Sequence, residues 1–176
     1  VDPSGPPPAV RDIAAITYAA NPHKKGLDRV LAAWASARRA DEELVVAGVA
    51  GPDREGVRFA GSLAPEEYRA LLRRARVYVS APRWEDFGIA QLEALADGCV
   101  LVAAHAPGPY VALPLARALD ARLVARDEDG LGHAIRTALD DPADGYAERA
   151  TALVAPYRTA AVDALVADRL LPALLA

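Results

Sequence analysis

The stretch from Ser80 to Cys99, SAPRWEDFGIAQLEALADGC, decides the fold class of this chain. The apolar run RVYVSA (76–81) leads into it and predicts a strand, and CVLVAA (99–104) predicts the next strand. Between them, residues 87–97 carry apolar side chains at helical spacing. A strand, a helix and a second strand in this order form a βα unit, which indicates parallel strands joined by a right-handed crossover.

The same alternation runs through most of the chain. Further strands are expected at residues 12–18, 43–48, 57–61 and 121–125, with helices between them and a helical C-terminal region from Gly130. We therefore predict an α/β fold: a Rossmann-like, doubly wound parallel sheet of about six strands, with helices on both faces and a helical C-terminal tail. In such sheets ligands bind beyond the carboxyl ends of the strands, where the strand order reverses.

Composition narrows the possible partners. The chain has 176 residues, a net charge of −4 and one cysteine. Nucleic-acid binding depends on basic surface that neutralises phosphates, so no nucleic-acid partner is expected. The N-terminus lacks the zones of a signal peptide and no apolar run reaches the roughly 18 residues that span a bilayer, so we expect a cytoplasmic protein.

Two glutamates, Glu85 and Glu93, flank the start of the helix predicted at residues 87–97. Asp86 is expected to cap this helix through its side chain, which leaves Glu85 free. Ile89, Leu92 and Ala96 should form the buried stripe, with Glu93 half-buried at its border. Carboxylates accept hydrogen bonds from sugar and ribose hydroxyls, so the pair suits a polyhydroxyl ligand. The alternative is that Glu85 is a solvated loop residue and Glu93 an ordinary surface charge.

Cationic and backbone groups in the same crevice suit an anion. The amides of Phe87, Gly88 and Ile89 lie at a helix N-terminus, where phosphates bind readily. Lys24 and Lys25 follow the first strand and can reach a phosphate there, although both could equally be solvated. The three histidines and the single cysteine have no metal-ligand spacing, so no metal site is expected.

Together these features resemble the C-terminal, donor-binding domain of the family 4 (group 1) glycosyltransferases, which have the two-domain fold called GT-B. The resemblance covers nearly the whole chain, through KKGLDRVLAAW, LVVAG, VRFAGSL and YRALLRRARVYVSAPRWEDFGIAQLEALADGCVLVA. Its most specific element is the E-x7-E spacing of Glu85 and Glu93 around a Phe-Gly pair.

The resemblance implies a role for each site residue. Glu85 would be the catalytic residue at the donor sugar, and Glu93 would hold the ribose hydroxyls. The sugar and the diphosphate would be bound by Lys25, Lys24, Phe87, Gly88 and Ile89. Backbone near Arg58, Phe59 and Gly61 would face the base. Such enzymes retain the anomeric configuration and use neither a metal nor another cofactor.

The resemblance also implies a division of the chain. Residues 1–11 would be the remnant of an interdomain linker, residues 12–156 the nucleotide-sugar-binding domain, and residues 157–176 a C-terminal helix that packs toward an absent N-terminal acceptor domain, in cis or in trans. The donor would be a nucleotide sugar such as a UDP- or GDP-sugar. Without the acceptor domain we expect donor binding but no hexosyl or related transfer. Membrane association would come only through that domain, and the uncovered tail could cause self-association.

Two departures leave an alternative open. The family usually has an arginine where this chain has Ala20, and HAPGPYVALP (105–114) lacks the usual Gly-Gly and glutamate. These changes favour a degenerate, non-catalytic domain that serves as a binding module. A third possibility, an unrelated flavodoxin-like regulatory domain, is disfavoured by Glu85, Glu93 and Lys25.

Overall fold

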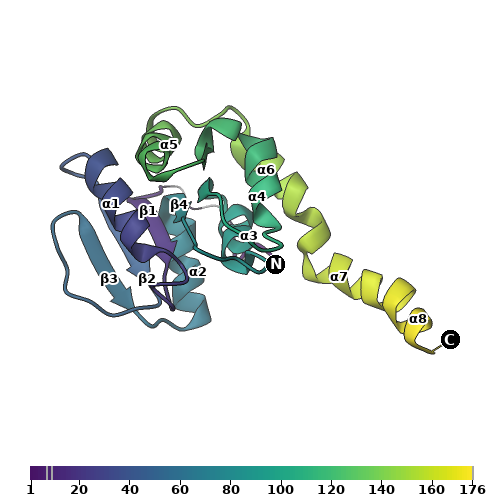
Figure 1. Cartoon of the computed structure of the whole chain (residues 1–176). Coiled ribbons are helices and arrows are strands. Elements are labelled where there is room, and N and C mark those ends of the chain that lie inside the picture. Colours follow the sequence, from purple (N-terminus) through teal and green to yellow (C-terminus); the bar gives the residue numbers. More distant parts are fainter. Residues whose placement is uncertain (7, 9, 176) are drawn as a thin grey trace.

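The computed structural model describes residues 1–6, 8 and 10–175, and in this part of the chain a six-stranded sheet forms the centre (Figure 1). Its strands are β1 (Ile13–Tyr18), β2 (Leu44–Ala47), β3 (Val57–Gly61), β4 (Ala75–Ser80), β5 (Val100–Ala104) and β6 (Val124–Ala125). All neighbouring strands are parallel, in the order β3-β2-β1-β4-β5-β6. This is the doubly wound Rossmann order, so the predicted fold class is confirmed.

Helices cover the sheet on both faces. On one side α1 (Leu27–Ala37) packs against α5 (Glu128–Asp140). On the other, contacts link α2 (Pro65–Arg74) to α3 (Ile89–Ala96), and α6 (Tyr146–Val154) to both α3 and α4 (Ala112–Leu119). The helices after β1 and β4 therefore lie on opposite faces, and the strand order reverses between these two neighbouring strands.

The core explains why the strands are apolar runs rather than alternating patterns. All four residues of β2 are buried, as are the first five residues of β1. Such strands are shielded by helices on both faces, so neither face needs polar side chains. In α1 the buried side comprises Leu27, Val30, Ala33, Trp34 and Ala37.

The sixth strand is shorter than the sequence predicts. Residues 121–125 were expected to be strand, but Ala121–Leu123 form a 3-10 turn and only Val124 and Ala125 pair with β5. The cause is Asp120, whose side chain accepts a hydrogen bond from the backbone amide of Arg122 at 3.0 Å. An aspartate that caps a turn in this way competes with extended structure.

The N-terminal segment lies against the domain. The amide of Ser4 donates to Asp97 Oδ1 at 2.7 Å, and its hydroxyl lies 3.0 Å from both carboxylate oxygens of Asp97. Arg11 donates to the carbonyl oxygens of Ala75 and Asp97 at 2.5 and 2.6 Å. This segment therefore reaches the C-terminal end of α3.

The C-terminal region leaves the body of the domain (Figure 1). After the short turn Ala155–Tyr157 come α7 (Thr159–Leu165), a π-helical turn (Val166–Leu170) and α8 (Leu171–Leu175), none of which has a buried residue. Large apolar side chains on it are exposed: Val162, Leu165, Leu170, Leu171, Leu174 and Leu175. None of the helices in the described ranges combines the length and apolar character needed to cross a bilayer.

Candidate functional site

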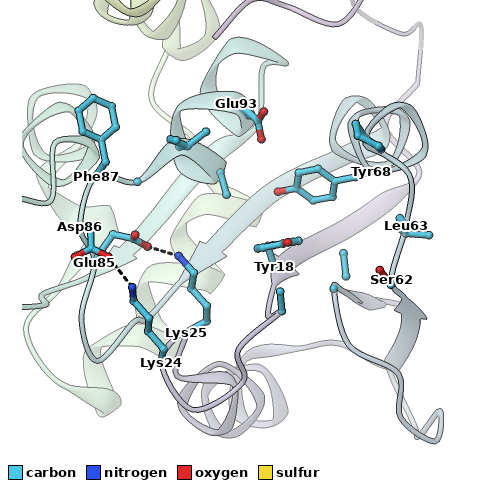
Figure 2. Close-up of a pocket in the computed structure, with 17 residues that line it drawn as sticks. Tyr18, Lys24, Lys25, Ser62, Leu63, Tyr68, Glu85, Asp86, Phe87 and Glu93 are labelled. Atoms are coloured by element: carbon cyan, nitrogen blue, oxygen red, sulfur yellow. Dashed lines mark hydrogen bonds and ion pairs between the residues drawn. The ribbon is translucent and has the colours of Figure 1, made fainter.

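A cavity of about 550 Å³ opens at the carboxyl edge of the sheet (Figure 2). Its walls come from the segments that follow β1, β2, β3 and β4 and from the first turns of α2 and α3. It thus lies where the strand order reverses, the position at which doubly wound sheets bind ligands. Among the predicted site residues, the cavity is lined by Lys24, Lys25, Glu85, Phe87, Gly88, Ile89 and Glu93.

Glu85 is buried and paired, so the alternative of a solvated loop residue is wrong. Only 5% of its surface is exposed. Its Oε2 accepts from Lys25 Nζ at 2.7 Å and from Gln91 Nε2 at 3.0 Å. The ammonium of Lys25 and the amide of Gln91 replace hydrogen bonds to water that the Glu85 carboxylate loses on burial. Figure 2 shows the Lys25 and Glu85 side chains pointing toward each other at one end of the cavity.

Gln91, which was not among the predicted site residues, holds the Glu85 carboxylate in place through a hydrogen bond from its buried side chain. Its Nε2 lies 2.8 Å from Ser80 Oγ, which lies 3.1 Å from Tyr110 Oη. Ser80, Gln91 and Tyr110 are all buried, and burial raises the pKa of the Tyr110 phenol to about 12. A glutamine beside Leu92 on the inner side of a helix was the available signal, since buried amides require polar partners.

Asp86 does not cap the helix, contrary to the prediction. The helix begins at Ile89 with Gly88 as its N-cap, in the left-handed conformation (φ 93°) and without a side-chain cap. Asp86 lies two residues before this cap. Its Oδ2 instead accepts from Lys24 Nζ at 2.6 Å and its Oδ1 from Trp84 Nε1 at 2.7 Å. These hydrogen bonds, that of Lys24 first, lower the pKa of Asp86, and the bond to Asp86 raises the pKa of Lys24.

The orientation of α3 also differs from the prediction. Ile89 was expected in the buried stripe but is 58% exposed, whereas the buried side comprises Gln91, Leu92, Ala94 and Leu95. The helix starts two residues later than expected, so Ile89 occupies its first turn at the open edge of the sheet, where it borders the cavity. The first amides of a helix have no intrahelical partner, and the residues Gly88, Ile89 and Ala90 at this helix start line the cavity.

Glu93 is half-buried as predicted, with 26% of its side chain exposed. Its Oε1 lies 3.4 Å from Nη1 of Arg69 on α2. Burial raises the pKa of the Glu93 carboxyl, and the charge of Arg69 opposes that rise. Its carboxylate lies across the cavity from the Glu85 and Lys25 pair (Figure 2).

Another wall of the cavity is aromatic and polar, and its two tyrosines were not among the predicted site residues. The rings of Tyr18 and Tyr68 lie 5.3 Å apart between centroids. Ser62 and Leu63, which follow β3, line the cavity beside them. A tyrosine that ends an apolar strand was the only signal for Tyr18.

The three residues expected near the base, Arg58, Phe59 and Gly61, lie outside the cavity lining, which after β3 begins at the next residue, Ser62. Arg58 pairs with Glu43 at 3.0 Å, and the amide of Phe59 donates to Asp53 at 2.8 Å. Gly61 accepts from the amide of Gly48 at 2.8 Å, still within the sheet edge. In this part of the chain, Ser62, the first residue after β3, is the first to border the cavity.

The loops after β1 and β4 are locked together. Gly26 has a left-handed backbone (φ 63°), and a Cβ there would lie 2.0 Å from the carbonyl oxygen of Ala81. The amide of Arg83 donates to the carbonyl of Lys24 at 2.9 Å. Only glycine allows this approach, which brings both lysines to the glutamate loop.

The assembled site offers two ammonium groups, two carboxylates and a helix N-terminus around one cavity. Ammonium groups and helix amides suit a phosphate, and carboxylates suit hydroxyl groups. Within the described residues, no group of three or more His, Cys, Asp or Glu side chains is placed to hold a metal ion. A ligand that carries both phosphates and hydroxyls matches this set of groups.

One protein family matches most of this chain. The family model described as "Glycosyl transferases group 1" matches residues 12–141. The phosphatidyl-myo-inositol mannosyltransferase of Propionibacterium freudenreichii subsp. shermanii is 38% identical over 153 residues, which cover 76% of this chain and 36% of that protein.

Two solved structures show the same fold. Anabaena HepE, in complex with UDP and glucose, superposes with a TM-score of 0.71 at 18% identity, covering 92% of this chain and 49% of that one. The C-terminal domain of the group 1 protein LpcC from Francisella tularensis superposes with a TM-score of 0.52 at 19% identity, covering 78% of this chain and 95% of that domain. This chain thus spans 36% of the mannosyltransferase and about half of HepE. The chain belongs to the group 1 glycosyltransferases and has the Rossmann-like fold of a GT-B C-terminal domain.

Proposed function

We propose that this chain is the nucleotide-sugar-binding half of a retaining, metal-independent glycosyltransferase that transfers a hexosyl or related sugar. One observation carries the proposal: Glu85, paired with Lys25, and Glu93 face the same cavity at the point where the strand order reverses. Neither a pure phosphate site nor a pure sugar site needs this combination. A nucleotide sugar needs both kinds of group, cations for its diphosphate and carboxylates for its hydroxyl groups.

The diphosphate of the donor would lie at the end of the cavity that holds the lysines. Lys25 and Lys24 supply positive charge, and the amides of Phe87, Gly88 and Ile89 supply donors at the start of α3. Lys24 also compensates for Ala20, which lines the cavity where the family usually has an arginine. The diphosphate would displace the carboxylates that these ammonium groups now contact.

The donor sugar and the nucleoside would extend from the diphosphate in opposite directions. Glu85 would act as the catalytic residue at the sugar, since its carboxylate accepts hydroxyl hydrogen bonds and stabilises positive charge that develops at the anomeric carbon. Glu93 would hold the ribose hydroxyls. The base would reach the wall made by Ser62 and Leu63, farther along the cavity (Figure 2).

The acceptor would bind to a second, N-terminal domain, present in cis or in trans. Transfer takes place in the cleft between the two domains, so residues 1–176 alone would bind the donor without transferring the sugar. Residues 1–11 would link the domains, residues 12–156 would bind the donor, and residues 157–176 would cross to the acceptor domain. The exposed leucines of that tail then have an apolar partner, and without it they favour self-association. The whole protein would work in the cytoplasm and reach membranes only through the acceptor domain.

Calorimetric titration with UDP, GDP, ADP and their sugars tests the proposal. We expect sub-millimolar binding of at least one nucleotide, weakened roughly tenfold in Glu93→Gln because a charged hydrogen bond is lost. Glu148→Gln on α6, exposed and outside the cavity lining, is the matched control. Binding should persist in EDTA. If no nucleotide binds the folded domain, the proposal is wrong and a degenerate binding module becomes the better explanation.

A further inference from the structure

We propose that Arg69 is a positioning residue that keeps Glu93 ionised and directed into the cavity. This inference rests on the proposed role of Glu93 as the ribose-binding carboxylate. Arg69 does not line the cavity, and the E-x7-E spacing gives no reason to single it out. Its importance follows from the contacts of its guanidinium group.

Three hydrogen bonds fix the guanidinium of Arg69. Nε donates to Asp97 Oδ2 at 2.6 Å, Nη2 donates to the carbonyl oxygen of Asp2 at 2.7 Å, and Nη1 donates to Glu93 Oε1 at 3.4 Å. The guanidinium is planar, so two fixed nitrogens determine where the third lies. The side chain of Arg69 is only 16% exposed, which leaves little room for another rotamer.

Asp97 fixes the position of the Arg69 guanidinium group. Its side chain is fully buried and accepts from Arg69 and from both the amide and the hydroxyl of Ser4. A buried carboxylate with this many donors does not release its cation readily. The segment containing Asp2 and Ser4 therefore joins α2 to the C-terminal end of α3, one turn beyond Glu93.

The charges that face Glu93 explain why Arg69 is needed. The carboxyl lies in a half-buried position, and burial together with the negative charge of Asp97 raises its pKa. Arg69 lowers it, whereas the neighbouring Tyr68 phenol remains neutral because burial raises its pKa. The Glu93 pKa is already raised with Arg69 in place, and without Arg69 burial and the charge of Asp97 raise it further. A protonated carboxyl loses the charge that strengthens its hydrogen bonds to ribose hydroxyls.

The test compares Arg69→Gln, Arg69→Lys and the control Arg74→Gln. Arg74 is on the same helix but binds the exposed Asp12, at 2.5 and 2.9 Å. The Glu93 carboxyl is titrated by carbon-13 NMR without ligand, and nucleotide binding is measured by calorimetry from pH 5 to pH 8, with UDP, GDP and ADP as probes. Circular dichroism verifies that each variant is folded.

We expect the Glu93 pKa to rise in Arg69→Gln and the acid limb of nucleotide binding to move to higher pH by the same amount. At pH 7 affinity should fall by up to roughly fivefold, because the Glu93 carboxylate is no longer held toward the cavity and its hydrogen bond to the ligand weakens. Arg69→Lys keeps the positive charge, but an ammonium cannot hydrogen-bond to Asp97 and Glu93 at the same time in this geometry. The Glu93 pKa should therefore rise less in Arg69→Lys than in Arg69→Gln. Arg74→Gln should match the wild type.

The outcomes separate this inference from the proposed function. A Glu93 pKa that is the same in wild type, Arg69→Gln and Arg69→Lys overturns the inference, even if nucleotides bind normally. If the pKa rises but wild-type protein binds no nucleotide, Arg69 controls the ionisation of Glu93 and the proposed function fails. If Arg69→Gln does not fold, the comparison of Arg69→Lys with wild type decides.

Discussion

The carboxylate of Glu85 and the ammonium of Lys25 lie 2.7 Å apart, with 6% and 23% of their side chains exposed. They come from loops that follow different strands and are separated by 60 residues in sequence. The pair therefore both stabilises the fold and holds the two groups that the proposed donor needs. Substitution of either residue affects stability as well as binding.

Lys25→Met should destabilise the domain by about 2 kcal/mol, because it leaves the buried Glu85 carboxylate without a cation. The double variant Lys25→Met/Glu85→Gln removes both charges and should recover a large part of this loss. Urea unfolding at pH 7 measures both effects. Equal free energies of unfolding for the single variant and the wild type would contradict the structural role of the pair.

Asp86→Asn should strengthen nucleotide binding by roughly threefold, because the substitution releases Lys24 and removes a negative charge from the rim of the cavity. Both side chains are exposed, so little stability should change. The effect should shrink in high salt. Asp144→Asn, also exposed and absent from the cavity lining, provides the comparison. Weaker binding in Asp86→Asn would mean that Asp86 itself contacts the ligand.

Gln91→Leu should separate sugar from nucleotide recognition. Gln91 contacts Glu85 at 3.0 Å but does not line the cavity. Its loss should leave UDP, GDP or ADP binding nearly unchanged and reduce the extra affinity that the attached sugar gives by roughly fivefold. Gln91→Glu, which brings a second carboxylate beside Glu85, should be worse. Calorimetry with each nucleotide and its sugar provides the measurement, and equal losses for both ligands would argue against this role.

Glu42→Gln should lower stability at neutral pH but not in acid. The Glu42 oxygens accept from Arg136 at 2.7 and 2.9 Å, and these bonds lower the pKa of Glu42 below its ordinary 4.5. Since the folded pKa is the lower one, the stabilisation is complete above about pH 5 and is lost as pH falls through the folded pKa. We expect a cost of about 1 kcal/mol at pH 7. The exposed Glu66→Gln is the control, and a pH-independent cost would exclude this linkage.

The sheet and its edge were predictable because strands buried on both faces are uninterrupted apolar runs. β3 has the bounds that the sequence predicts, whereas β6 is short because Asp120 directs a turn that hydrophobic pattern does not reveal. The carboxylates Glu85 and Glu93 were recognisable from their spacing. Their spacing did not show which side chains bind them, Lys25 and Gln91 for Glu85 and Arg69 for Glu93.

What the sequence left out depends on contacts between distant segments. Asp86 binds Lys24, 62 residues away, and Arg69 reaches Asp97 across 28 residues. A local pattern predicts a helix cap at Asp86 because capping is a local interaction, but a nearby cation competes for the same carboxylate. Ile89 was misplaced for a local reason: Gly88 has a left-handed backbone, and the helix starts after it, two residues later than predicted.

The two tryptophans form a pair of intrinsic fluorescent probes. Trp34 is completely buried and donates to the carbonyl oxygen of Gly56 at 2.7 Å, so its emission reports the integrity of the sheet. Trp84 is 47% exposed and hydrogen-bonded to Asp86 at the rim of the cavity. A ligand that draws Lys24 away from Asp86 changes the environment of one indole and leaves the other as an internal reference. Occupancy and unfolding can therefore be followed by fluorescence in the unlabelled chain, with Trp34→Phe and Trp84→Phe assigning each signal.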